Sequence, residues 1–163
     1  MATDTTRSLG GWTKTLPVSR IIFPQGLHDR LKYFLWRVYT PMHPFVRDTL
    51  LSLGVIQHVG RQDYLLGKIA EGQSIQEFAA FLISCGYGNH FVAWEDEGEV
   101  VSLRRVEDFS RQYHIRIFED REVRGHYEYT PESYPILHLK EVGQQDRREE
   151  FLRLLGDKIV PHP

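Results

Sequence analysis

Three histidines, His114, His126 and His138, recur at equal intervals in the second half of the chain. Each stands in a short segment in which apolar and polar residues alternate. These segments span residues 113–118, 123–129 and 136–141. Alternation with a period of two is typical of a half-buried strand. The three segments are therefore expected to form an antiparallel meander whose polar face carries the histidines.

The apolar residues determine the register that is expected for the first two of these strands. Pairing Ile115 with Gly125 keeps the apolar side chains on one face. His114 then lies opposite His126, and the connecting loop ends at Arg121, where three-residue loops usually have Gly or Asn. A two-residue turn, or a register shifted by two residues, would separate the two histidines. Both alternatives stay open on the sequence alone.

A second expected pairing would bring in the third histidine. If Tyr127 pairs with Leu137 around a turn at residues 130–134, His126 lies opposite His138. The three imidazoles would then line up across three adjacent strands.

Imidazoles arranged in this way have the chemistry of a metal site. Neutral histidines bind zinc and leave a fourth position for a water molecule, whose pKa then falls toward neutrality. Glu128 would orient or deprotonate that water. Two features argue against a bound dication. The positive charges of Arg116, Arg124 and Lys140 would repel it, and the chain lacks the short ligand motif His-Glu-x-x-His. The candidate metal ligands are His114, His126 and His138, and the candidate catalytic residues are Glu128 and His126.

The same face would instead suit an anion. Arginine presents a bidentate fork to a phosphate or a carboxylate, and histidine adds a protonatable group. A third interpretation is a solvated face held by cross-strand pairs of opposite charge. The candidate ligand-binding residues are Arg116, Arg124, His126, Glu128 and Lys140.

Several classes of protein are not expected. The chain has no Walker loop, no dinucleotide fingerprint and no Gly-x-Ser-x-Gly elbow, so no standard catalytic motif and no cofactor are predicted. Cys85 is the one cysteine, which excludes a disulfide within the chain and a cysteine-based zinc site. The formal net charge of −2 makes nucleic acid an unlikely partner. With no signal peptide or long apolar run, we expect a cytoplasmic protein that does not enter membranes.

The remaining patterns predict a single α+β domain over residues 16–160, after a mobile tail at residues 1–15. Its antiparallel sheet would have roughly five to seven strands, as a hairpin plus a C-terminal meander, packed by about four helices. Ser74 and Glu77 form a capping box before one of these helices. Helices are expected over 27–39, 44–53 and 75–85, and a last helix is expected from a cap at Asp146 and Glu149 to a stop at Gly156, with residues 151–155 providing its buried side chains. Further strands are expected over 16–23, 55–59, 63–69, 90–94 and 100–104.

The function expected from these patterns is a small binding or interaction protein whose His/Arg/Glu-lined sheet face is the ligand or anion site. A protein partner or a small anionic ligand would fit it. The alternative is a small hydrolase, metal-dependent or not, that uses the three histidines with Glu128 as general base. A hydrolase requires the histidines to converge, whereas an interaction surface can be flat and open.

Overall fold

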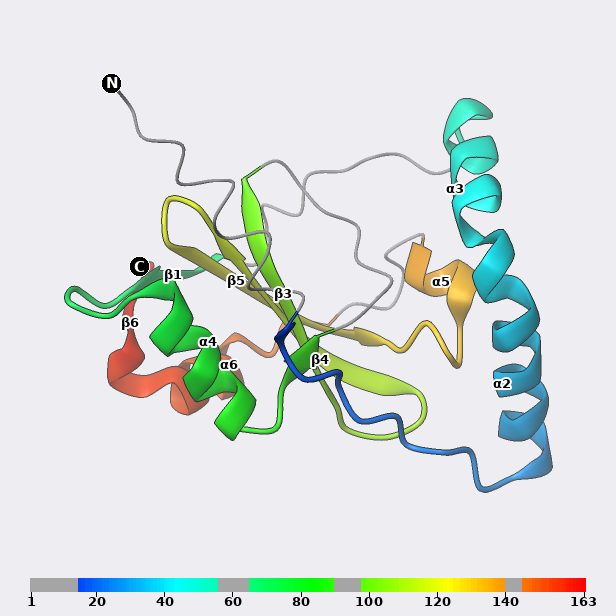
Figure 1. Ribbon diagram of the computed structural model, residues 1–163, viewed down its shortest axis with the longest axis horizontal. Helices are drawn as coiled ribbons and strands as arrows, with labels where there is room; N and C mark the ends of the chain where they lie inside the picture. Colours follow the sequence, from blue (N-terminus) through cyan, green and yellow to red (C-terminus); the bar gives the residue numbers. More distant parts are fainter. Residues whose placement is uncertain (1–14, 56–64, 90–97, 140–144) are drawn as a thin grey trace.

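A six-stranded sheet organises the residues that the computed structural model describes, namely 15–55, 65–89, 98–139 and 145–163 (Figure 1). The strand order is β2-β3-β4-β5-β1-β6, and all paired strands are antiparallel. The strands are β1 (Leu65–Ile69), β2 (Gly88–Asn89), β3 (Glu99–Val106), β4 (Arg111–Phe118), β5 (Glu122–Tyr129) and β6 (Ile159–Pro161). The expected α+β class is confirmed, with β3, β4 and β5 forming a central meander.

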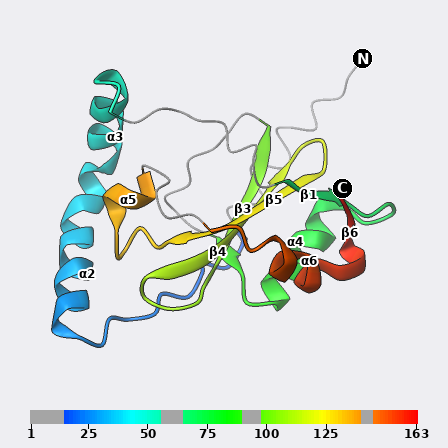
Figure 2. The ribbon, with the colours of Figure 1, turned by 180° about the vertical axis from the view of Figure 1, so that it is seen from behind.

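The helices fall into two groups in space. Helices α4 and α6 pack on one face of the sheet, while α2 and α3 lie together at the opposite end of the molecule (Figures 1 and 2). The helices are α2 (Leu27–Tyr39), α3 (His43–Ser52), α4 (Ile75–Ser84), α5 (Pro135–Leu139) and α6 (Arg148–Leu155), with 3-10 turns η2 (Thr40–Met42) and η4 (Gly156–Lys158). Across the described ranges, no helix has both the length and the apolar character of a membrane span.

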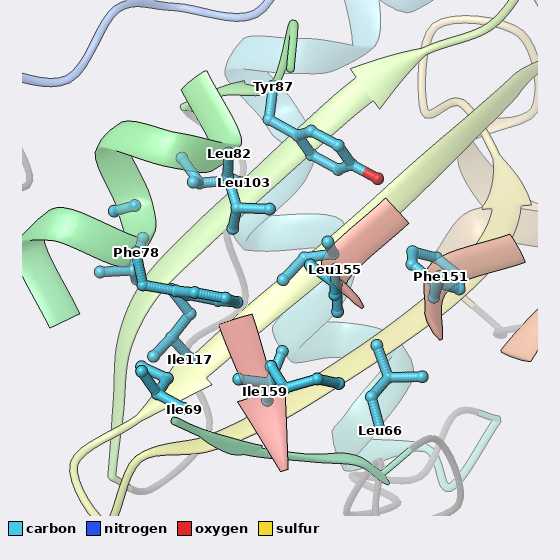
Figure 3. Packing of buried hydrophobic residues seen from close by; sticks show 14 of the residues in the cluster. Leu66, Ile69, Phe78, Leu82, Tyr87, Leu103, Ile117, Phe151, Leu155 and Ile159 are labelled. Atoms are coloured by element: carbon cyan, nitrogen blue, oxygen red, sulfur yellow. The ribbon is translucent and has the colours of Figure 1, made fainter. Parts of the chain in front are cut away.

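The hydrophobic core lies between α4, α6 and one face of the sheet (Figure 3). Phe78 of α4 and Phe151 of α6 are almost completely buried there, as are Leu103 and Ile115 of the meander. Burying each such side chain contributes about 1.5–3 kcal/mol. Gly125 lies in the same layer, where an added Cβ would come within 2.8 Å of Leu66 and 3.1 Å of Phe151. One face of β4 and β5 is thereby committed to the core, and the other face carries the polar residues.

Of the registers that the sequence leaves open for the β4–β5 hairpin, the structure has the one that keeps the apolar side chains on one face with a three-residue loop. Ile115 pairs with Gly125, and His114 pairs with His126. The loop ends at Arg121 with φ of 72°, the left-handed conformation that a side chain rarely adopts. The Arg121 guanidinium offsets this cost by donating hydrogen bonds to the carbonyl groups of Ile69, Ala70 and Gln73.

The third strand predicted for residues 136–141 is wrong. Residues Pro135–Leu139 form α5, so His138 does not face His126 across a strand pair. Proline fits the first turn of a helix because its φ is already helical and its missing N–H is not needed there. The preceding turn is held by Thr130, whose side chain donates to the carbonyl of Phe109 at 2.6 Å. Lys140 lies outside the described residues.

Other predictions had mixed outcomes. The strand expected over 16–23 is reduced to one bridge from Val18 to Asn89, because Pro17 and Pro24 provide no N–H for a longer ladder. The helix over 27–39 is confirmed, and so is the capping box of Ser74. Residues 1–14, 56–64 and 90–97 lie outside the described part. These ranges include nearly all of the expected tail, most of segment 55–59, the start of segment 63–69 and the whole of segment 90–94.

Candidate functional site

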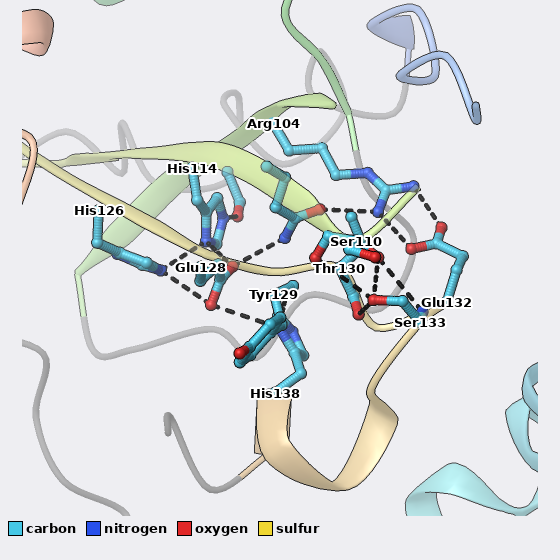
Figure 4. Close-up of polar contacts among 12 residues, drawn as sticks. Arg104, Ser110, His114, His126, Glu128, Tyr129, Thr130, Glu132, Ser133 and His138 are labelled. Carbon is cyan, nitrogen blue, oxygen red and sulfur yellow. Dashed lines mark hydrogen bonds and ion pairs between the residues drawn. The ribbon is translucent and has the colours of Figure 1, made fainter. Parts of the chain in front are cut away.

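Three residues converge on the polar face of the β4–β5 hairpin (Figure 4). His114 comes from β4, and its cross-strand partner His126 is followed two residues later by Glu128 on the same face of β5. Nδ1 of His114 lies 3.3 Å from Nε2 of His126. The Glu128 carboxylate straddles the pair, with Oε1 3.2 Å from His114 Nδ1 and Oε2 3.2 Å from His126 Nε2. The β-sheet period alone therefore brings two imidazoles and a carboxylate to one point.

This cluster is shielded from solvent. His126 is 1% exposed and Glu128 is 2% exposed, while His114 is 9% exposed. Within the described ranges, these three residues form the one group of potential ligands whose donor atoms all lie within 4.8 Å of one another. No described donor makes a hydrogen bond of ordinary geometry to Oε2 of Glu128. That oxygen is therefore buried beside imidazole nitrogens without an ordinary hydrogen bond to them.

Neighbouring side chains hold the ligand atoms in place. Ser102 Oγ lies 2.8 Å from Nε2 of His114, on the side of the ring away from the cluster. Gln112, which pairs with Glu128 across the strands, donates from Nε2 to Glu128 Oε1 at 2.8 Å. Each contact restricts the rotation of a ring or a carboxylate in the cluster.

A buried ion pair supports Gln112 in turn. Arg104 donates to Oε1 of Gln112 at 3.0 Å and binds both oxygens of Glu132, at 2.9 and 2.7 Å. The Nε of Arg104 donates to Ser19 Oγ at 2.6 Å. Arginine and carboxylate are both buried, so the pair is charge-balanced where an unpaired ion would be costly.

His138 reaches the cluster from α5. Its Nδ1 lies 3.0 Å from the carbonyl oxygen of Tyr129 and 3.3 Å from Oε2 of Glu128. Since a carbonyl can only accept, Nδ1 of His138 carries the proton in this contact. It is therefore a neighbour of the carboxylate, outside the group of three that converges most closely.

Histidines dominate the electrostatics of Glu128. Burial alone would raise the pKa of its carboxyl group, but the charges of His138 and His126 and the close contacts of His114 and His126 hold that pKa well below its ordinary value. The carboxyl group is therefore ionised at neutral pH, which is the state a ligand or a charge partner requires.

Two of the three cations expected around this face, Arg116 and Arg124, form ion pairs of their own. Arg116, which is fully buried, donates to Glu99. Arg124 donates to Glu122 at 2.8 Å and lies 4.0 Å from the centre of the Phe118 ring. Each of these positive charges is offset by a carboxylate of its own, which removes much of the charge that would repel a dication.

Sequence reasoning found the three members of the cluster and missed the residues that hold them. Gln112 lies two residues before His114 and therefore on the same face of the strand. The register that pairs His114 with His126 also pairs Gln112 with Glu128, so this contact could have been predicted from it. Ser102 and Glu132 gave no such signal, because their positions depend on β3 and on the turn after β5.

Comparisons with known proteins found no match from which the role of the cluster could be inferred. No protein-family model, no curated protein and no solved structure matches this chain. The chemistry of the cluster therefore has to be inferred from its own geometry.

Proposed function

We propose that the protein binds a divalent first-row transition-metal ion, with His114, His126 and Glu128 as its ligands. The observation that carries this proposal is the spacing of the three residues. Ligand atoms about 2.0–2.1 Å from a tetrahedral ion lie roughly 3.3 Å from one another. The imidazole nitrogens are 3.3 Å apart, Oε1 of Glu128 lies 3.2 Å from the first and Oε2 lies 3.2 Å from the second, so the carboxylate would bind the ion with both of its oxygens.

The surroundings support the same proposal. A histidine that binds a metal through one nitrogen usually donates its other N–H to a fixed acceptor, which is the place that Ser102 occupies beside His114. Gln112 orients the carboxylate in the same way. The buried Oε2 of Glu128 would gain, from the ion, the partner that no described donor supplies with ordinary geometry.

Two imidazoles and one carboxylate suit zinc and iron(II), and they leave coordination positions for water or a ligand. Hydrolysis is the second candidate function, because a bound ion lowers the pKa of its water. Since each member of the cluster is at most 9% exposed, a substrate would reach the ion only if the covering residues moved. In that case Glu128 acts as a ligand, and the general base is a residue other than Glu128.

The test is the metal content of the full chain purified without an affinity tag, measured by elemental analysis. The metal-free protein is then titrated separately with Zn²⁺, Fe²⁺ and Mn²⁺ in a calorimeter. The variants are His126→Ala and Glu128→Gln. His162→Ala serves as the matched control, because His162 is exposed and its backbone, not its ring, bonds to Leu66.

Near-stoichiometric binding in the wild type and in His162→Ala, with at least about a hundredfold weaker binding in both cluster variants, is the expected result. Glu128→Gln keeps the size of the side chain, so its loss of binding reports on the charge. Wild-type protein that binds none of the three ions, or cluster variants that bind as the wild type does, would overturn the proposal.

A further inference from the structure

Exposed apolar side chains are concentrated in one part of the molecule. Among the large apolar residues that the described ranges expose, all but Val160 lie between residues 18 and 55. The most exposed are Leu27 at 86%, Phe45 at 73% and Val18 at 71%. Scattered exposed apolar residues are normal, but a contiguous group marks a surface that another molecule covers.

Helix α2 presents two different faces. One face holds Trp36, which is 4% exposed, and Lys32, whose Nζ donates to the hydroxyl of Tyr134 at 2.8 Å. The opposite face carries an apolar stripe that points to solvent: Leu27, Leu31, Phe34, Leu35 and Val38, each more than half exposed. Because α2 lies at the edge of the molecule in both views, nothing drawn beyond it would obstruct a second molecule (Figures 1 and 2).

The exposed apolar surface is large for a single molecule. Further exposed apolar residues follow the α2 stripe in the chain, namely Met42, Phe45 and Leu53, and side chains of these kinds bury on the order of 100–200 Å² each. At the exposures observed, the whole group offers on the order of 800 Å², more than the roughly 300–600 Å² of the largest patch on a typical monomer. The five residues of the α2 stripe account for roughly 500 Å² of it, which is the size that one partner contributes to a weak interface.

We infer that this stripe is the contact between two copies of the chain, which pair through antiparallel α2 helices. Leu27, Leu31, Phe34 and Val38 follow spacings of four, three and four residues, the pattern of a helix–helix seam. If two antiparallel copies of α2 cross at the point between Leu31 and Phe34, Leu27 of one copy lies against Val38 of the other. Leu31 of one copy likewise lies against Phe34 of the other. The stripe is therefore complementary to itself, as a two-fold symmetric interface requires.

The charges beside the stripe give this dimer a recognisable salt response. Arg30 and Arg37 are exposed and lie on the same flank of α2, one heptad apart. In a two-fold antiparallel pair the same flanks meet, so Arg30 of one copy lies near Arg37 of the other. Added salt screens this repulsion and tightens the dimer. An acidic partner or an anionic membrane would show the opposite response, because salt weakens attraction between opposite charges.

The test is sedimentation equilibrium of the full chain over a range of micromolar concentrations, at low and at high salt. Three variants accompany the wild type. Leu31→Glu places a charge at the centre of the seam, Arg37→Glu turns the flanking repulsion into attraction, and Val160→Glu is the matched control for an exposed apolar residue elsewhere. Circular dichroism checks that each variant retains its helix content.

We expect a wild-type dimer that tightens with salt, a dissociation constant at least about a hundredfold higher in Leu31→Glu, and no change in Val160→Glu. Arg37→Glu is expected to dimerise more tightly than the wild type at low salt, a gain that misfolding does not explain. Three results would overturn the inference: a monomer at all concentrations, a dimer that Leu31→Glu leaves intact, or a monomer that binds phosphatidylserine vesicles.

Discussion

At the scale of single residues, the cluster depends on how the ring of His114 is held. If Nδ1 binds the ion, Nε2 carries the proton and donates it to Ser102 Oγ at 2.8 Å. We expect Ser102→Ala to weaken metal binding by about 10–100-fold, the usual effect of losing such a partner. Competition with a chromophoric chelator measures this change.

Ser84→Ala is the control for the Ser102 variant, because Ser84 donates only to the carbonyl of Phe81 on an exposed helix turn. Unchanged affinity in both serine variants would mean that His114 does not bind through Nδ1. The contact between Ser102 Oγ and His114 Nε2 would then have no part in metal binding.

At the scale of elements, α4 shows how a local signal fixes a helix end. Ser74 Oγ accepts a hydrogen bond from the N–H of Glu77, and the Glu77 carboxylate accepts from the Ser74 N–H at 2.8 Å. We expect Ser74→Ala to lower the free energy of unfolding by about 1 kcal/mol, measured by urea denaturation. Ser52→Ala, at the far end of α3, should change it much less, and equal losses in the two variants would contradict this role for the cap.

The same cap gives a pH dependence. Backbone and side-chain hydrogen bonds from Ser74 hold the pKa of Glu77 below its ordinary value. Its contribution to stability is therefore complete above the pKa of the unfolded chain and disappears as the pH falls through the folded pKa. We expect the wild type and Glu77→Gln to differ in unfolding free energy at neutral pH and to converge in acid. A difference that stays constant across this range would contradict the linkage.

Elements also show how far the sequence could be read. The capping box and α2 were predictable because each rests on neighbours in sequence, a Ser/Glu pair and a helical stripe. Alternation on both sides of the β4–β5 turn predicted the two strands and their faces, but it left more than one register open. The strand predicted at 136–141 failed because Ile136 to Leu139 alternates for too few residues to distinguish a strand from a short helix after Pro135. His138 nevertheless lies beside Glu128, a tertiary placement that no local pattern specifies.

At the scale of the whole molecule, the proposed ion would couple the site to global stability. Its ligands come from β4 and β5, the middle of the sheet, so unfolding destroys the site completely. A ligand that binds only the folded chain stabilises it by about 2.7 kcal/mol at a concentration one hundred times its dissociation constant. For a chain of this size, that corresponds to a rise in Tm of roughly 5–10 °C.

We expect this rise when the metal-free protein is heated with excess Zn²⁺, and its reversal when a chelator is added, as followed by circular dichroism. Protein concentration must be held constant, because a dimer that dissociates on unfolding also makes Tm depend on concentration. Glu128→Gln should show no rise with Zn²⁺. If that variant gains as much as the wild type, the ion binds elsewhere on the folded chain, and the buried cluster is then a hydrogen-bonded part of the sheet in which His114 and His126 serve as charge partners of Glu128.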